Sequence, residues 1–162
     1  MEELNKVDSF KLLMLKQQVI SQLNLDYQEQ EDSFESSQEI KSYGYKFLKS
    51  NRGVEINLHI GESIWLSVYL KKEDYSEDDA NDFVEPTFNL EYWLWNNGYL
   101  FKKNPFKLTT YSTEFEQQVL GFFSFLGKVF KYKELKKILD GKIWNDGYFD
   151  WKDKGSYPVY DS

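Results

Sequence analysis

Two stretches in the first half of the chain alternate between aliphatic residues and polar or aromatic ones. In VEINLHI (54–60) and IWLSVYL (64–70), every second residue is Val, Ile or Leu. A period of two is typical of a β-strand with one buried face. The segment GES (61–63) joins them as a short turn, and IKSYGYKFLKS (40–50) predicts the preceding strand, because a turn-like Asn-Arg-Gly follows it. We therefore expect a three-stranded antiparallel meander.

A hairpin is predicted further along the chain, in FNLEYWLWNNGYLFKK (88–103). Asn97-Gly98 lies between two alternating aromatic segments, and Asn-Gly is a preferred pair for a two-residue hairpin turn. Pairing across this turn assigns the side chains to two faces of the sheet. One face would carry Phe88, Leu90, Tyr92, Leu94, Tyr99 and Phe101, and the other Asn89, Glu91, Trp93 and Trp95.

Near both ends of the chain, the apolar residues recur every three or four positions. This spacing predicts an N-terminal helix over 3–24 and a strongly apolar helix over 113–130, with Thr113 and Glu116 at capping-box spacing. A shorter helix through 131–140 is expected to end at Gly141. The sequence thus predicts an α+β fold: an antiparallel sheet of about five strands, meander plus hairpin, with the N-terminal helix and the two C-terminal helices packed on it.

The remaining segments lack a period. We expect a single globular domain over 1–162, with acidic loops at 26–39 and 72–86 and an aromatic-rich C-terminal tail at 141–162. The chain has no cysteine, its first residues do not form a secretory signal, and no apolar run reaches membrane-spanning length. These features indicate a cytoplasmic protein with no membrane partner.

Charge is divided unevenly along the chain. Residues 1–91 hold 9 Lys and Arg against 19 Asp and Glu, a net of −10, whereas residues 92–162 hold 11 against 8, a net of +3. An acidic surface repels nucleic-acid phosphates and attracts basic proteins. We therefore expect a basic protein partner and no direct binding to nucleic acid.

The sequence contains few candidate catalytic residues and motifs. His59 is the single histidine, on the polar face of a predicted strand beside Glu55 and Asn57, where we interpret it as structural or solvated. The phosphate-binding loops and the G-x-S-x-G nucleophile motif are absent, and no segment has an EF-hand pattern. We expect no enzyme activity, no catalytic residue, no cofactor and no metal site. An enzyme that uses paired carboxylates stays open as the weakest alternative.

The segment 71–86, KKEDYSEDDANDFVEP, is the first candidate binding surface. Aromatic side chains among carboxylates provide an anchor surrounded by charge that steers a basic partner. The alternative is that the aromatics fold back onto the domain and the acids are only hydrated. The candidate partner-binding residues are Glu73, Asp74, Tyr75, Glu77, Asp78, Asp79, Asp82, Phe83 and Glu85.

The second candidate surface is the sheet face opposite the aliphatic one. If helices cover only one face, it forms an aromatic shelf that suits a protein, a sugar or a flat ligand. If a helix covers it, the same residues belong to the core, and we favour that reading because so many exposed tryptophans promote aggregation. Its aromatic members would be Trp65, Tyr69, Trp93 and Trp95.

In its size, its acidity and its lack of cysteine and catalytic motifs, the chain resembles small bacterial immunity proteins, which neutralise a cognate toxin. The resemblance is to a functional category with many folds and involves no specific motif. It implies a non-enzymatic inhibitor of a basic protein such as a toxin or nuclease. Two alternatives remain: a DNA-mimic inhibitor of a nucleic-acid-binding enzyme, and a ligand-binding domain that uses the aromatic sheet face.

Overall fold

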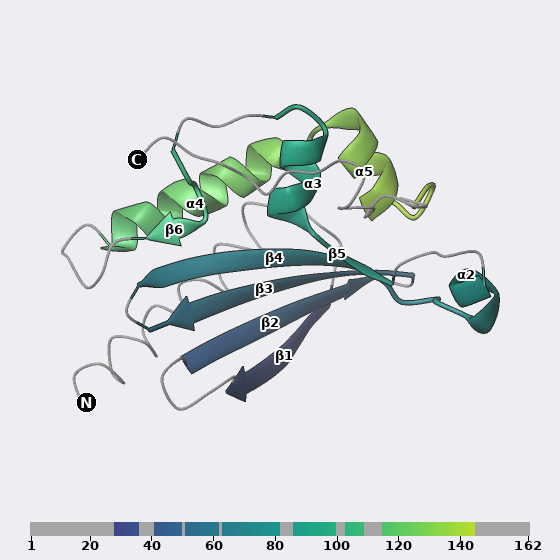
Figure 1. Ribbon diagram of the computed structural model, residues 1–162, viewed down its shortest axis with the longest axis horizontal. Helices are drawn as coiled ribbons and strands as arrows, with labels where there is room; N and C mark the ends of the chain where they lie inside the picture. The colour runs from purple at the N-terminus through teal and green to yellow at the C-terminus, as the bar shows by residue number, and fades with distance from the viewer. Residues whose placement is uncertain are drawn as a thin grey trace.

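The structure is a computed structural model that describes residues 28–35, 41–49, 51–61, 63–81, 86–99, 103–108 and 115–144. Within them, a twisted antiparallel sheet lies under a layer of helices (Figure 1). The protein is therefore α+β, as its periodicity predicts. The predicted N-terminal helix (3–24) lies outside the described residues.

The sheet has the strand order β1-β2-β3-β4-β5, with β6 on the same edge of β4 as β5. The predicted meander is confirmed as β2, β3 and β4, each pairing antiparallel with the next. The remaining strands are β1, an unpredicted edge strand, and the short strands β5 and β6. The bounds are β1 Gln28–Glu35, β2 Lys41–Lys49, β3 Arg52–Ile60, β4 Ile64–Lys72, β5 Thr87–Asn89 and β6 Lys107–Leu108.

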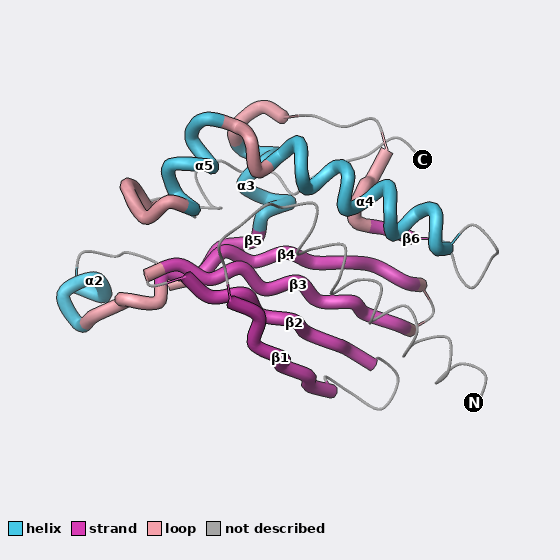
Figure 2. The backbone as a smooth tube through the Cα atoms, turned by 180° about the vertical axis from the view of Figure 1, so that it is seen from behind, coloured by secondary structure: helices cyan, strands magenta, loops and turns pink. Residues whose placement is uncertain are grey.

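Three helices, α3, α4 and α5, lie over one face of the sheet, whereas α2 stands apart at one end of the molecule (Figures 1 and 2). The two predicted C-terminal helices are confirmed as α4 and α5, and Gly141 follows α5 with a positive φ of 78°. The bounds are α2 Glu77–Asn81, α3 Leu90–Asn96, α4 Phe115–Val129 and α5 Lys133–Leu139.

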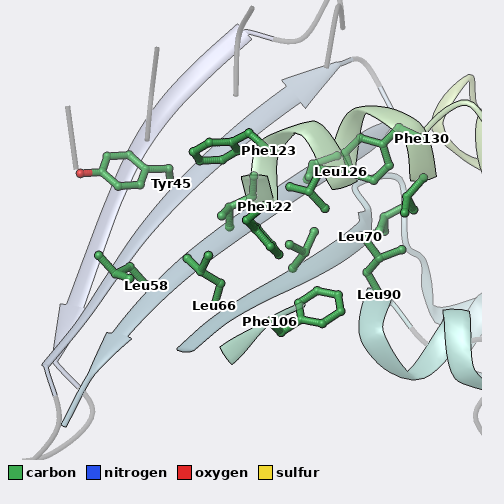
Figure 3. Close-up of a cluster of buried hydrophobic side chains, with 14 of the residues drawn as sticks. Tyr45, Leu58, Leu66, Leu70, Leu90, Phe106, Phe122, Phe123, Leu126 and Phe130 are labelled. Carbon is green, nitrogen blue, oxygen red and sulfur yellow. The ribbon is translucent and has the colours of Figure 1, made fainter. Parts of the chain in front are cut away.

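The core lies between this helical layer and the aliphatic face of the sheet (Figure 3). The alternating residues of β3 and β4 are each at most 5% exposed, and Phe122, Phe123 and Leu126 of α4 pack towards them. Phe106, just before β6, contacts Phe122 edge-on with the ring centroids 5.5 Å apart. Burial of this one face is what fixes the strand register, because a slip by one residue would turn the aliphatic side chains away from the helices.

The predicted acidic loop at 26–39 is wrong in part, since β1 occupies Gln28–Glu35. This strand pairs with β2 along its whole length, from Gln28 opposite Leu48 to Glu35 opposite Lys41. Its sequence, QEQEDSFE, has neither β-branched residues nor an aliphatic alternation, which are the features that identify a strand in a sequence. Its β-conformation depends on hydrogen bonding to the exposed edge of β2.

The predicted hairpin at 88–103 is also wrong, because the chain leaves the sheet after three residues of β5 and forms α3. Asn89 caps this helix: its side-chain Oδ1 accepts hydrogen bonds from the amides of Glu91 (2.8 Å) and Tyr92 (3.5 Å). The buried residues Leu90, Trp93 and Leu94 have helical spacing.

Asn97-Gly98 ends α3 rather than turning a hairpin. Gly98 has a φ of 83°, its amide donates to the carbonyl of Trp95, and the Tyr99 amide donates to the carbonyl of Leu94. These two bonds form the Schellman arrangement, which needs a left-handed residue after the helix. The same left-handed preference makes Asn-Gly favourable in hairpins. The dipeptide therefore predicts a chain reversal, but it does not distinguish a hairpin turn from the end of a helix.

No helix in the described part of the chain is long and apolar enough to cross a membrane.

The cap of α3 can be tested directly. Asn89→Ala should lower the free energy of unfolding by about 1 kcal/mol, because two amides at the start of α3 lose their acceptor. Asn89→Asp is the matched control, since a carboxylate accepts the same bonds and suits the positive end of a helix. Urea denaturation of the three proteins measures the difference. Equal losses in both variants would contradict the assigned cap.

Candidate functional site

The acidic segment connects β4 to β5 at the end of the sheet that carries α2 (Figure 1). Its base is closed by the hydrogen bond from the Lys72 amide to the carbonyl of Pro86, at 2.8 Å. Residues 73–78 are all exposed, whereas Asp79 is half-buried. The segment is therefore a projection whose beginning and end are held together by the sheet.

A capping box builds the short helix α2. The amide of Ser76 donates to Oδ2 of Asp79 (2.9 Å), and the amide of Asp79 donates to Oγ of Ser76 (3.4 Å). Each of the two side chains thus accepts a hydrogen bond from a backbone amide at the helix start that has no acceptor within the helix. Asp79 is consequently part of the architecture of the loop rather than a free surface charge.

Lys72, at the end of β4, attaches this helix to the sheet. Its Nζ donates to Oδ2 of Asp79 (2.9 Å) and forms an ion pair with Asp74 (3.4 Å). The hydrogen bond from Lys72, together with that from the Ser76 amide, holds the pKa of Asp79 below its usual value. The same hydrogen bond to Asp79 raises the pKa of Lys72. Both groups stay charged around neutral pH, so the attachment persists there.

Arg52, the single arginine of the chain, holds the base of the loop from the other side. It is 5% exposed, and its Nη1 donates to the carbonyl of Asn51 (2.9 Å) and to Oδ1 of Asp74 (3.4 Å). Its Nε donates to the carbonyl of Ile138 (3.0 Å), and its Nη2 to that of Ile143 (3.1 Å). The indole ring of Trp144 lies 5.0 Å from the guanidinium carbon. One side chain therefore joins the acidic loop to the C-terminal end of α5.

Glu73 is also paired. Its Oε1 lies 3.0 Å from Nζ of Lys46 on β2, and its amide donates to the carbonyl of Asn51 at 3.1 Å. Three of the predicted partner-binding acids, Glu73, Asp74 and Asp79, thus already have basic partners within the molecule. Their role in positioning the loop was not foreseen from the sequence.

Two carboxylates in the described part of the loop remain unneutralised. In the described part of the chain, Glu77 and Asp78 of α2 are exposed and form no ion pair. Tyr75 beside them is 39% exposed, one of three large hydrophobic residues this exposed among the described ones. The structure thus brings together the predicted residues from Glu73 to Asp79. Asp82, Phe83 and Glu85 lie outside the described residues.

The predicted aromatic face does not form as expected. Trp65 and Tyr69 lie on β4, whereas Trp93 and Trp95 belong to α3, so the four do not share a sheet face. Trp93 is 0% exposed and stacks on Tyr99 in the core. The error follows from the hairpin prediction, because a helix sends these side chains in directions that a strand would not.

The sheet face around Trp65 carries a buried polar cluster instead of an open shelf. Ser42 and Asn57 on this face are each 2% exposed. His59 lies between two hydroxyls, with Nδ1 2.8 Å from Ser42 Oγ and Nε2 2.9 Å from Ser67 Oγ, and its ring stacks on Trp65. Burial lowers the pKa of His59, so the neutral imidazole is favoured. This environment is that of a structural histidine, as its position in the pattern indicates.

The sequence interpretation missed Arg52 and Lys72, which are the residues that position the acidic loop. Both lie at strand ends, where basic residues are normally solvated, and nothing in their spacing identifies their partners. One sequence feature does point to Arg52: it is the only arginine in a chain with nineteen lysines. A guanidinium can donate several hydrogen bonds in fixed directions from a buried position, which a lysine ammonium cannot do.

Among the described residues, no group of three or more His, Asp or Glu side chains is arranged to hold a metal ion. Comparison of the chain with protein-family models, with curated proteins and with solved structures finds no match. Its function has to be inferred from the geometry of the site.

The contribution of Arg52 can be separated from that of its ion pair. Arg52→Lys should lower the free energy of unfolding by about 3 kcal/mol, because an ammonium cannot reach the carbonyls of both Ile138 and Ile143, and each lost bond from a charged donor matters. Asp74→Asn, which removes only a half-exposed partner, should lower it by less than about 1 kcal/mol. Urea denaturation gives both values. Similar losses would show that the carbonyl bonds are unimportant.

His59 should make stability depend on pH. Its folded-state pKa lies below the ordinary 6.5, so the unfolded chain binds more protons between these two values. The free energy of unfolding should therefore fall as pH drops from 6.5 through the folded-state pKa. Urea denaturation of wild type and His59→Gln, at several pH values across this range, isolates the effect. Parallel pH profiles of the two proteins would argue against it.

Proposed function

We propose that this protein is a non-enzymatic binding protein, an immunity-type inhibitor that neutralises a basic protein partner such as a bacterial toxin or nuclease. The observation that carries the proposal is the acidic loop itself: it projects from the sheet, its base is fixed, and its tip presents Tyr75 beside the unpaired carboxylates of Glu77 and Asp78. An aromatic anchor within a charged surface is a common composition of protein interfaces.

Preorganisation supports this function. A loop that is ordered before it binds loses less conformational entropy on binding than a mobile one. Here the Ser76–Asp79 capping box, the Lys72 ion pairs and the buried Arg52 fix the backbone that carries Tyr75. The paired charges therefore serve affinity indirectly, and Glu77 and Asp78 are available to steer a basic partner.

A DNA-mimic inhibitor is supported less well. A mimic needs a row of free carboxylates that imitates backbone phosphates. In the described part of this segment, Glu73, Asp74 and Asp79 are neutralised by Lys46, Arg52 and Lys72, which leaves a discrete acidic patch on α2. An aromatic-face ligand binder has less support still, because Trp93 is buried in the core and the sheet face around Trp65 carries the buried polar residues Ser42 and Asn57.

The partner can be sought with the full chain as bait in lysate from its native cell, and with the products of neighbouring genes co-expressed as direct candidates. A captured protein counts only if it is basic, binds in purified form, and loses a measurable toxic or nuclease activity when this protein is added. If the protein binds such a partner but does not inhibit its activity, the proposed binding function stands and the proposed inhibitor function is wrong.

Two kinds of residue in the loop should affect different rates of complex formation with the purified partner. Glu77→Gln with Asp78→Asn should slow association at low salt and have little effect near 1 M salt, where the Debye length is about 3 Å. The matched control is Glu134→Gln with Asp140→Asn, which makes the same charge change on exposed positions in and after α5.

Tyr75→Ala should instead speed dissociation. A buried aromatic anchor contributes about 2 kcal/mol or more, which corresponds to a roughly 30-fold shorter lifetime. Surface plasmon resonance at two ionic strengths measures both rates. Unchanged kinetics in the loop variants would mean that the loop is only solvated surface.

A further inference from the structure

The region from the end of α4 to the residues after α5 carries a dense group of lysines that the proposed function does not use. Residues 128–142 contain six lysines and two acids, a net of +4, in a chain whose net charge is −7. Leu135, Ile138 and Leu139 of α5 face the core, so Lys133, Lys136 and Lys137 occupy its outer side. All six are exposed, and we call them the lysine face: Lys128, Lys131, Lys133, Lys136, Lys137 and Lys142.

These lysines differ from the basic residues of the sheet. Lys46, Arg52, Lys71 and Lys72 each form an ion pair, with Glu73, Asp74, Glu55 and Asp79 respectively. Across the described segments, none of the six residues of the lysine face has an acidic partner. The positive charge there is therefore unneutralised, and it attracts an acidic group from another molecule.

An unneutralised acidic surface lies at the same end of the molecule. In both views α2 and α5 occupy the same end of the long axis (Figures 1 and 2). Arg52 connects them, since it contacts Asp74 of the acidic loop and the carbonyl of Ile138 in α5. The helix that carries Glu77 and Asp78 and the helix that carries Lys133, Lys136 and Lys137 thus lie at one end of the protein.

We propose that this end is a self-complementary surface through which two copies of the chain form a two-fold dimer. In such a dimer, the acidic loop of each copy lies against the lysine face of the other. Placing complementary patches at one end favours this result, because a two-fold axis between them satisfies both pairs and closes the assembly. Patches at opposite ends would instead join copies head to tail into open chains.

Apolar surface at the same end supports the dimer. Of the large hydrophobic residues that are substantially exposed in the described segments, two belong to this end: Tyr75 at 39% and Ile143 at 37%. The carbonyl of Ile143 is held by Arg52, as is the side chain of Asp74 next to Tyr75. Exposed ion pairs alone contribute little to the free energy of association. Burial of these two side chains supplies the apolar contact that a specific interface needs.

Ionic strength provides the first test. The net charge of −7 on each copy opposes association, and it acts at longer range than the contacts between patches. Sedimentation velocity of the wild-type chain should give a monomer–dimer equilibrium at about 0.15 M salt, with a dissociation constant at least about tenfold higher at 1 M salt. A monomer at every concentration up to about 1 mM would overturn the proposal.

Charge reversal gives a sharper test. Glu77→Lys with Asp78→Lys makes the loop basic, and Lys136→Glu with Lys137→Glu makes the lysine face more acidic. Each variant alone should be monomeric, because the first brings like charges together at both contacts and the second removes the net charge of +4 from residues 128–142. A mixture of the two should form a heterodimer, since both contacts again join opposite charges. If the mixture stays monomeric while wild type dimerises, the dimer uses another surface and the proposal fails.

The wild-type protein also allows a test that does not depend on the folding of any variant. A zero-length carbodiimide joins carboxylates to amines in direct contact, and a mixture of ¹⁴N- and ¹⁵N-labelled chains separates links between copies from links within one. Links between copies should join Glu77 or Asp78 to a member of the lysine face. Mapped links that join other surfaces would overturn the proposal. The dimer and the proposed basic partner use the same acidic loop, so they would compete for it. A monomeric protein would leave the proposed inhibitor function intact, so the two can fail separately.

Discussion

Arg52 determines how the acidic loop and the lysine-rich helix α5 are placed relative to each other. Its guanidinium is almost fully buried, and it is satisfied by the carbonyls of Asn51, Ile138 and Ile143 together with the carboxylate of Asp74. A buried cation with so many partners leaves the chain few alternatives, because moving any of them would strand a charge away from water. The acidic loop, the start of β3 and the end of α5 therefore keep a fixed relation to one another, although they are far apart in sequence.

Internal ion pairs divide the acidic residues in the described part of the loop into two groups. Glu73, Asp74 and Asp79 are neutralised by Lys46, Arg52 and Lys72 and give the loop its shape, whereas Glu77 and Asp78 of α2 are exposed and form no ion pair. Counting carboxylates therefore overestimates the free charge of the loop. What the loop offers instead is a fixed backbone that presents Tyr75 among a small number of free charges, and rigid presentation of an anchor contributes more to a long-lived complex than added charge does.

The parts of the fold that could be predicted are those where apolar residues recur with a regular period. β3 and β4 follow the aliphatic alternation residue by residue, and α4 follows its apolar stripe, because the core selects those positions directly. The failures have two causes, one in a distant part of the chain and one in the local caps of a helix. β1 is a strand because the edge of β2 is available, and α3 is a helix because Asn89 and Gly98 cap it, although its aromatic residues fit a strand equally well.

The candidate site was identified from the sequence, but the ion pairs that hold its acidic residues were not. Composition alone marks the segment from Glu73 to Asp79 as unusual, since acids and an aromatic residue gather between two strands. Which acids are free depends on cations supplied by β2, β3 and β4, and the sheet register decides that neighbourhood: Gly53, next to Arg52, lies opposite Lys71, and Lys46 lies opposite Glu55. The pairing of these acids depends on the paired strands, so the partner recognition proposed for this loop depends on the assembled sheet as much as on the acidic segment.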